Sequence, residues 1–306
     1  MAFCLSHTGF EIPVTAIHLF SPNVGNIEAF AGPAADNDWH DAPFWMLNTF
    51  RFHDDGEDAN RSYARRMREI LAGVGASVVM SAPVAHTVMG ERAFQAAAIV
   101  RYPSPAAFYT MATSDALAEA SADRVQAFAD QYLIPVSTRW MPGFDLEKPV
   151  NPRANIREWN VDALAACPDH AFIGNHHTQM TLAAASALLD DPGFGHNSPV
   201  YMLNLLQYAG AAGKAKHDAY IAGGNNLTGG SLGRQFGLRV IYSAQKTGPT
   251  LIGDGRWHSV GIASYPSLHH FFSMGADPQY IDLHAGRRDG LSRTYIIAMQ
   301  PTLLQV

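Results

Sequence analysis

The chain repeats itself, and this repeat restricts the folds open to it more than any other feature of the sequence. The tetrapeptide WMLN at 45–48 returns as YMLN at 201–204, each time inside an apolar run. Further matches follow at a nearly constant spacing, among them GASVVMSA at 75–82 with GLRVIYSA at 237–244. Because self-similarity of this kind indicates a repeated supersecondary unit, we expect two copies of one domain.

Both copies show the same order of predicted elements: strand, helix, strand, strand, helix, strand. Period-two apolar runs predict the strands, and apolar residues three and four apart predict the helices. The first copy has strands at 44–52, 76–82, 94–102 and 132–136. Its first helix is at 59–71, and its second consists of two pieces, one that follows the N-cap Ser104 and runs to 111 and one at 116–131. This is the split β-α-β-β-α-β pattern of a ferredoxin-like fold, so the fold class is α+β.

The second copy differs from the first in its first helix. The glycine pairs at 223–224 and 229–230 fall in this region. Each glycine weakens a helix by about 1 kcal/mol relative to alanine, so we expect a broken or irregular helix there.

The repeats leave two segments outside them. Residues 1–43 form an N-terminal arm with one strand-like segment at 14–20, and residues 141–198 form a connecting insert with two predicted helices. The first repeat covers 44–140 and the second 199–306. An insert of this length either docks on the repeats or walls off a pocket.

Composition excludes several classes of function. The net charge is −6 and no cluster of Lys and Arg offers a phosphate footprint, so no nucleic-acid partner is expected. Two cysteines, Cys4 and Cys167, provide neither a disulfide framework nor a CxxC metal site. No run of about 18 apolar residues predicts a membrane span. We therefore expect a cytoplasmic protein, monomeric or homodimeric, that acts on a small molecule.

The doubled pattern resembles the dimeric α+β barrel superfamily, and within it a small domain family of unknown function. The aromatic-Met-Leu-Asn strand, the tyrosine on the first helix (Tyr63, Tyr220) and the arginine late on the second helix (Arg124, Arg287) carry this resemblance. It implies two sheets packed face to face, here within one chain as an intrachain pseudo-dimer. Related families include cofactor-free monooxygenases, lactone isomerases and haem enzymes. Where the family usually carries an acidic residue, this chain has Arg101 and Ser264, so a role of that carboxylate is not transferred.

Histidine is the most informative candidate for chemistry, because the two copies differ in it. His258 occupies the position of Gln95, and His270 that of Ala107. An imidazole can accept or donate a proton near neutral pH, so His258 and His270 are candidate catalytic residues together with Tyr220. The alternatives are a strand-end His258 that is exposed to water or bonded to a carbonyl, and a solvated His270. Candidate substrate-binding residues are Asn48, Tyr63, Arg101, Asn204, Tyr242 and Trp257.

Three functions remain open on this basis. The first is a cofactor-independent enzyme, such as an isomerase, a lyase or a cofactor-free oxygenase, acting on an apolar or aromatic metabolite in a sheet–helix cavity with His as proton shuttle. The second is a binding protein for a hydrophobic metabolite. The third is a haem- or metal-dependent enzyme, with His170, His176 and His177 of the insert as metal ligands or His284 as a haem ligand. No cofactor is expected under the first two.

Overall fold

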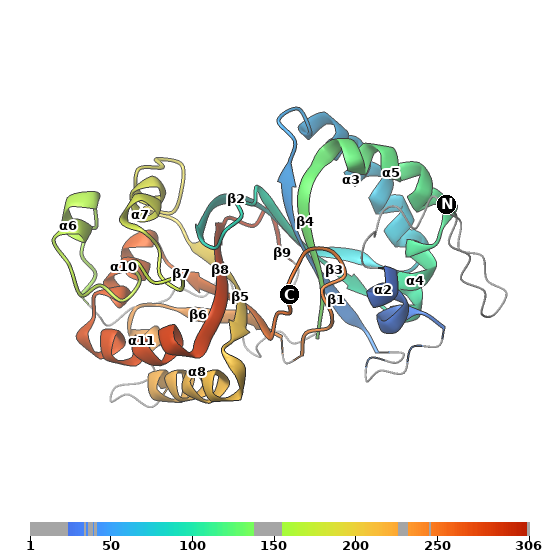
Figure 1. Cartoon of the computed structure of the whole chain (residues 1–306). Coiled ribbons are helices and arrows are strands. Elements are labelled where there is room, and N and C mark those ends of the chain that lie inside the picture. Colours follow the sequence, from blue (N-terminus) through green and yellow to red (C-terminus); the bar gives the residue numbers. More distant parts are fainter. Residues whose placement is uncertain are drawn as a thin grey trace.

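A computed structural model of the chain describes residues 24–33, 35, 39, 42–137, 155–225, 232–244 and 246–304. Within them, helices cover a nine-stranded antiparallel sheet (Figure 1). The strands are β1 (Phe44–Phe52), β2 (Ser77–Met89), β3 (Ala96–Tyr102), β4 (Phe128–Ser137), β5 (Val200–Tyr208), β6 (Arg239–Ser243), β7 (Ser259–Tyr265), β8 (Leu291–Met299) and β9 (Leu303–Leu304). The helices are α2 (Val24–Ala31), α3 (Glu57–Gly73), α4 (Pro105–Ala112), α5 (Asp115–Ala127), α6 (Val161–Ala165), α7 (Leu182–Leu189), α8 (Gly210–Asn225), α9 (Leu232–Gln235), α10 (Leu268–Gly275) and α11 (Pro278–Gly290).

The order of the strands repeats in the two halves of the chain. Across the sheet they run β4-β1-β3-β2-β8-β5-β7-β6, with β9 beside β2. The strands β5 to β8 thus take the same places in the second half that β1 to β4 take in the first. The predicted strand at 44–52 corresponds to β1. Strand β4 begins at Phe128, so the prediction of a helix up to residue 131 is wrong for its last turn, and β2 continues beyond its predicted end at residue 82.

Strand β2 is long because its two ends pair with different neighbours. Its first part, Ser77–Pro83, pairs with β3, and its last part, Val84–Met89, pairs with β8. On the opposite side, segment 246–252 lies against β4, where the amide of Leu133 donates to the carbonyl of Ile252 at 3.0 Å. These contacts join both ends of the strand order, so the sheet closes on itself.

Apolar side chains from both halves fill the inside of the closed sheet. Trp45 of β1 stacks on Tyr242 of β6, with ring centroids 5.2 Å apart. Two glycines with positive φ lie against tyrosine rings of the other half. A Cβ on Gly90 (φ 122°) would lie 2.0 Å from the Tyr295 ring, and a Cβ on Gly253 (φ 98°) would meet the Tyr132 ring. Only glycine permits such approach with this backbone.

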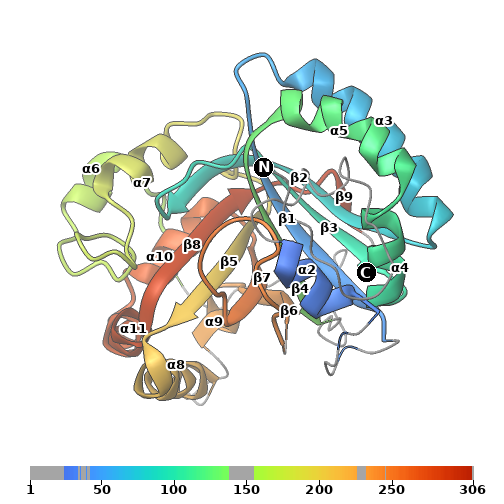
Figure 2. The same ribbon diagram turned by 45° about the vertical axis from the view of Figure 1, so that its right-hand side comes forward.

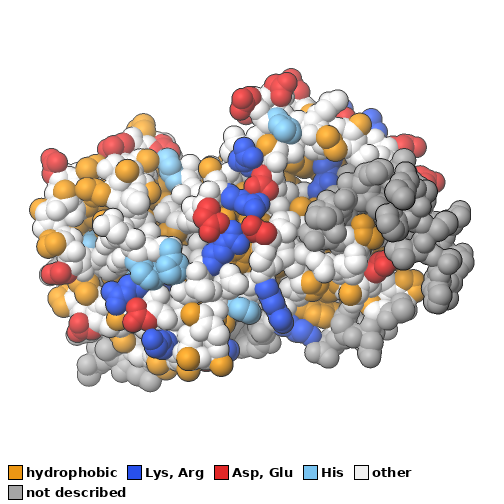
Figure 3. Space-filling view, viewed as in Figure 1, with side chains coloured by type: hydrophobic (Ala, Val, Ile, Leu, Met, Phe, Trp, Pro, Cys, Tyr) orange, Lys and Arg blue, Asp and Glu red, His pale blue; other side chains and the backbone are white. Residues whose placement is uncertain are grey.

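A network of charges crosses between the halves at one end of the interior, where Figure 3 shows blue and red side chains together at the centre of the molecule. Arg92 donates to Asp130 at 2.9 Å and to Asp254 at 2.8 Å. Arg293 donates to Asp254 at 2.9 Å and to Glu91 at 2.5 Å. Exposed ion pairs contribute little alone, but a shared network couples the two halves.

The helices form outer layers on the two halves (Figures 1 and 2). Helices α3 and α5 cover the first half, and α8 and α11 cover the second. The insert packs on the second half, where Trp159, Phe172 and Met180 share an apolar cluster with Phe271 and Phe272 of α10. None of the helices in the described part of the chain is long and apolar enough to cross a membrane.

Local sequence signals explain where several helices begin. Ser104 caps α4, since its hydroxyl accepts a hydrogen bond from the amide of Ala107 at 3.2 Å, and Pro105 follows it as expected. The insert helices α6 and α7 lie within the two helices predicted at 159–166 and 178–189, and both are shorter than predicted. The predicted strand at 14–20 lies outside the described residues, and α2 was not predicted.

The expectation of a broken first helix in the second half is wrong for the described part of it. Helix α8 continues through Gly223 and Gly224 to Asn225. A Cβ on Gly223 would lie 2.6 Å from the side chain of Leu283 on α11. The glycine therefore allows α8 and α11 to approach closely, and this packing offsets its low helix propensity. The pair at 229–230 lies outside the described residues.

Candidate functional site

His258 lies one residue before β7, and its imidazole supports the backbone of the neighbouring strand. Its Nδ1 accepts a hydrogen bond from the amide of Tyr208 at 2.9 Å, and the exposed ring stacks on the Tyr208 ring. In the first half, Gln95 has the same role, because its Oε1 accepts from the amide of Phe52 at 2.7 Å. The two residue types differ, but they make the same contact at the end of the first strand of each half.

Tyr242 and Trp257 lie inside the closed sheet, on the face opposite the helices. Besides stacking on Trp45, Tyr242 donates its hydroxyl proton to the carbonyl of Ser137 at 2.7 Å. Trp257 is 1% exposed. Both side chains contribute to the contact between the two halves.

Arg101 is an exposed side chain on β3. The nearby acid Asp123 lies 3.3 Å from Arg66 on α3 and accepts a hydrogen bond from Ser62 at 2.8 Å, so its carboxylate is engaged there. Arg101 is therefore placed at the surface, outside the space between helices and sheet.

His270 lies in the first turn of α10, beside an open groove of about 300 Å³. Its Nδ1 lies 2.9 Å from the hydroxyl of Ser267, and the neighbouring His269 accepts a hydrogen bond from the amide of Trp159 at 3.0 Å. Other residues around the groove are Ile156, Arg157, Glu158, His196, Asn197 and Pro266. Of the expected catalytic residues, His258 and Tyr220 are connected through the rings of Tyr208 and His217, whereas His270 lies beside this groove.

In the first half, a chain of polar side chains between helices and sheet is complete. Arg124 on α5 donates to Oε1 of Gln131 on β4, and it also bonds the hydroxyl of Tyr63 on α3. Gln131 donates to Oδ1 of Asn48 at 3.4 Å, and Asn48 donates to the carbonyl of Met46 at 3.0 Å. Each of these side chains has a partner, which is expected for buried polar groups.

The second half keeps the arginine but replaces its partners. Thr294 stands where the first half has Gln131; its side chain is shorter, and Arg287 reaches its hydroxyl only at 3.4 Å. Tyr220 occupies the place of Tyr63, but its hydroxyl bonds that of Tyr280 at 2.9 Å. Arg287 thus lacks both of the side-chain oxygens that its counterpart bonds.

The asparagine of the second half also lacks a partner. Asn204 donates to the carbonyl of Met202 at 2.9 Å, but no donor among the described residues reaches its Oδ1. In the first half the amide of Gln131 fills this position. Asn204 is half-buried although it lies on a central strand, whereas Asn48 is 8% exposed. Asn204 is therefore the more exposed of the two asparagines, and the shorter Thr294 takes the place of Gln131 beside it.

Arg287 is a buried cation without an acid. It is 5% exposed, and its second hydrogen bond goes to the carbonyl of Thr178 at 3.3 Å. Within the described residues, no carboxylate lies at ion-pair distance from it. Burying a charge is costly unless an opposite charge or strong hydrogen bonds compensate it.

Two buried imidazoles flank Arg287. His284, one turn earlier on α11, is 3% exposed, and its Nε2 has no hydrogen-bond partner among the described residues. Burial, and then the charges of Arg287 and Arg288, lower the pKa of His284 to about 3. His217 on α8 packs against Tyr220, and burial followed by the charge of Arg287 lowers its pKa to about 4. Both imidazoles are therefore neutral at pH 7.

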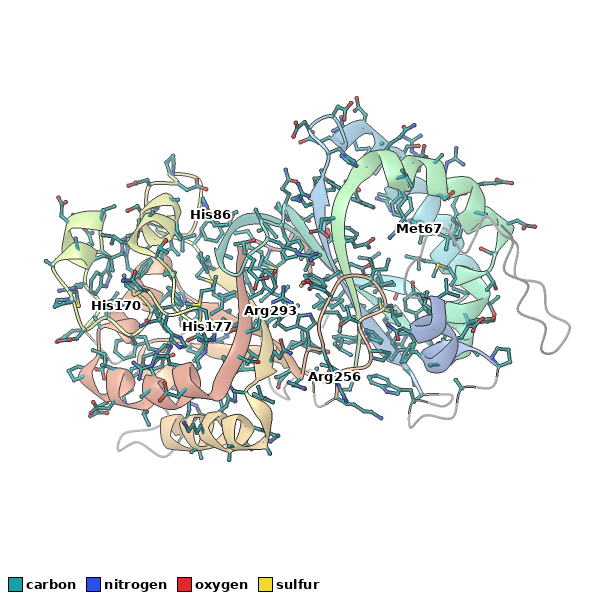
Figure 4. The ribbon with its side chains drawn as sticks, viewed as in Figure 1. Met67, His86, His170, His177, Arg256 and Arg293 are labelled. Atoms are coloured by element: carbon teal, nitrogen blue, oxygen red, sulfur yellow. The ribbon has the colours of Figure 1, made fainter. Side chains whose placement is uncertain are left out.

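The insert covers this part of the second half, and Figure 4 shows His170 and His177 on that side of the molecule. Nε2 of His177 donates to the carbonyl of Leu291 at 3.1 Å. His170 is 1% exposed and donates from Nε2 to the carbonyl of Phe272 at 2.9 Å. The insert histidines thus bond the second half of the chain.

These histidines are not arranged as a metal site. In the part of the chain that the structure describes, no group of three or more His, Cys, Asp or Glu side chains is placed to hold a metal ion. Aromatic rings surround His284. Phe172, Tyr280 and Tyr220 have ring centroids 5.8, 5.7 and 6.5 Å from the imidazole.

Comparison with known proteins finds similarity only among solved structures. No family model matches the chain, and no curated protein matches it. A protein of unknown function from Rhodopseudomonas palustris is 27% identical over 35% of this chain and 85% of its own length, with a TM-score of 0.32. An anthrone oxidase-like protein is 10% identical over 86% and 92%, with a TM-score of 0.47. The chlorite dismutase of Candidatus Nitrospira defluvii is 10% identical over 85% and 91%, with a TM-score of 0.40.

These structures include proteins of the dimeric α+β barrel superfamily, the superfamily expected from the sequence. The three TM-scores lie below 0.5, so the description of the fold depends on the strand order and register of this chain itself.

Proposed function

We propose that the chain is a duplicated ferredoxin-like unit whose two copies associate as an intrachain pseudo-dimeric α+β barrel. The contacts between the halves support this proposal, because they occur in reciprocal pairs. Val84 pairs with Met299, and Val136 pairs with Thr247. Thr247 is the counterpart of Val84 in the second copy, and Met299 is the counterpart of Val136 at the same spacing. Two subunits related by a twofold axis make contacts of this kind.

We propose further that the protein is an enzyme for a small apolar or aromatic molecule, with its site in the second half between α8, α11 and the sheet. His284 accepts a proton from the substrate at Nε2, and the hydroxyl of Tyr220 bonds a substrate oxygen. The electron pair left on the substrate is delocalised onto that oxygen. In an isomerase the proton is returned at another position, in a lyase the electron pair expels a leaving group, and in a cofactor-free oxygenase it reduces O₂.

The unpartnered Nε2 of His284 carries this proposal. A buried polar atom without a partner costs about 1–3 kcal/mol, and a bound substrate would supply the partner that Nε2 lacks. The imidazole is neutral at pH 7, so one ring nitrogen has a free lone pair, and with the proton on Nδ1 this nitrogen is Nε2. The apolar cluster around it, which includes Phe172, suits an apolar or aromatic substrate.

Proton exchange tests the proposal without knowledge of the natural substrate. The probe is 2-tetralone, a bicyclic ketone with acidic protons beside its carbonyl, and NMR in D₂O measures the loss of these protons. The wild type should accelerate exchange, His284→Gln should reduce it to the background rate, and His258→Gln should leave it unchanged. Equal rates in the wild type and His284→Gln, or a wild-type rate equal to background, would reject the proposed step.

A further inference from the structure

The comparison of the two halves also indicates what the ligand of the second half must carry. In the first half, one carboxamide connects an arginine to an asparagine, since Gln131 accepts from Arg124 and donates to Asn48. In the second half both ends of this connection remain, as Arg287 and Asn204, but the carboxamide is absent.

We propose that the second half binds a ligand whose negatively charged oxygen contacts Arg287 and whose adjacent hydroxyl or N–H group donates to Oδ1 of Asn204. The ligand thereby takes the place that the side chain of Gln131 fills in the first half. This inference names the ligand class for the proposed function and rests on it for the location of the site.

The charge of the ligand follows from the surroundings of Arg287. The guanidinium is 5% exposed, and its hydrogen bonds to Thr178 and Thr294, at 3.3 and 3.4 Å, go to neutral oxygens. A carboxylate or enolate oxygen supplies the missing opposite charge, and a charge-assisted bond to arginine is about twice as strong as a neutral one. Because the flanking His217 and His284 are neutral, they do not compete with Arg287 for the anion.

The requirement for a donor follows from Asn204. Its amide nitrogen donates to the carbonyl of Met202, so Oδ1 is the atom without a partner among the described residues. Oδ1 is an acceptor, so a ligand with only acceptor groups leaves it unpaired. A ligand with an acidic oxygen beside a hydroxyl, such as a 2-hydroxy aromatic acid or an enediolate, satisfies Arg287 and Asn204 at once.

Three small aromatic probes separate these two requirements. Salicylate has a carboxylate and an adjacent hydroxyl, benzoate lacks the hydroxyl, and 2-hydroxybenzyl alcohol lacks the charge. Calorimetric titration of the full chain should show one salicylate bound per chain. Benzoate should bind about fivefold more weakly for the loss of one hydrogen bond, and the neutral alcohol at least about tenfold more weakly. Undetectable salicylate binding, or equal binding of the alcohol, would overturn the inference.

A single substitution can restore the first-half arrangement in the second half. Thr294→Gln should connect Arg287 to Asn204, raise the Tm by about 2–4 °C and abolish salicylate binding. Arg287→Gln should also abolish binding. Salicylate bound by Thr294→Gln as tightly as by the wild type places the ligand elsewhere, and a lowered Tm shows that no space is free beside Asn204. Either result refutes the inference.

The two proposals can fail independently. If salicylate binds and Thr294→Gln blocks it, while 2-tetralone exchanges only at background, the anion site stands and the proton transfer to His284 does not. If exchange depends on His284 but salicylate does not bind, the proton transfer to His284 stands and the anion site does not.

Discussion

Acidification should loosen the contact between the insert and the second half through His170. In the folded chain, Nε2 of His170 donates to the carbonyl of Phe272, and Nδ1 accepts from the amide of Phe172 at 3.2 Å. The neutral imidazole thus uses both nitrogens. A second proton on Nδ1 would face an amide N–H group and break this bond. Burial is the main cause that lowers the pKa of His170 to about 4.

The size of the effect follows from the two pKa values. In the unfolded chain the pKa is about 6.5, so the unfolded state binds the proton more readily and stability rises with pH. The contribution of neutral His170 is fully present above pH 6.5 and is lost as the pH falls from about 6.5 towards 4. Neutral His170 contributes about 3 kcal/mol in total to the free energy of unfolding, and about 2 kcal/mol of this is lost at pH 5. Native domains are stable by only about 5–15 kcal/mol.

Urea denaturation at about pH 7.5 and pH 5 measures this loss. His170→Gln retains a donor and an acceptor but does not titrate, so its free energy of unfolding should fall about 2 kcal/mol less than that of the wild type between the two pH values. His53 is exposed, and His53→Gln should behave like the wild type. If all three proteins lose the same stability, His170 does not carry the pH dependence.

Two further predictions concern the contact between the halves. Gly90→Ala should lower the free energy of unfolding by more than about 2 kcal/mol, because the new Cβ meets the Tyr295 ring and φ is positive. Gly224→Ala has free space at its Cβ and should be neutral or stabilising; equal Tm shifts in the two variants would disprove the close approach. Asp254→Asn removes the negative charge that Arg92 and Arg293 share and should cost about 1 kcal/mol, less at high salt. A loss independent of salt would point to another cause.

The repeated strand order was predictable because it depends on local patterns that occur twice. The apolar, aromatic-rich run at 44–52 places β1, and Ser104-Pro105 marks the start of α4. Contacts between residues distant in sequence were harder to predict. The part of β2 from Val84 to Met89 pairs with β8, and nothing within this segment indicates a partner near the other end of the chain.

The candidate site was harder to predict, because its main signal is a missing partner. His258 drew attention as a titratable residue in place of Gln95, yet both side chains accept a backbone hydrogen bond. Arg287 is present in both copies as an arginine and therefore resembled a structural residue. The informative difference between the copies lies in the neighbour of this arginine, which is Gln131 in the first copy and Thr294 at the matching position of the second. A comparison of the copies for lost hydrogen-bonding partners of retained charges would have found it.

The division of β2 between two neighbours affects how the chain folds during synthesis. Among the described residues, the segment Val84–Met89 has β8 as its neighbouring strand, and the outer edge of β4 has segment 246–252, so both edges are covered by the second half. Ribosomes add about 5–20 residues per second, so β8 follows β4 by roughly 10–30 s. During this interval the first half exposes two open strand edges and the apolar face that later lies inside the closed sheet. Open edges pair readily with other chains, so nascent chains of this protein should depend on chaperones until the second half has emerged.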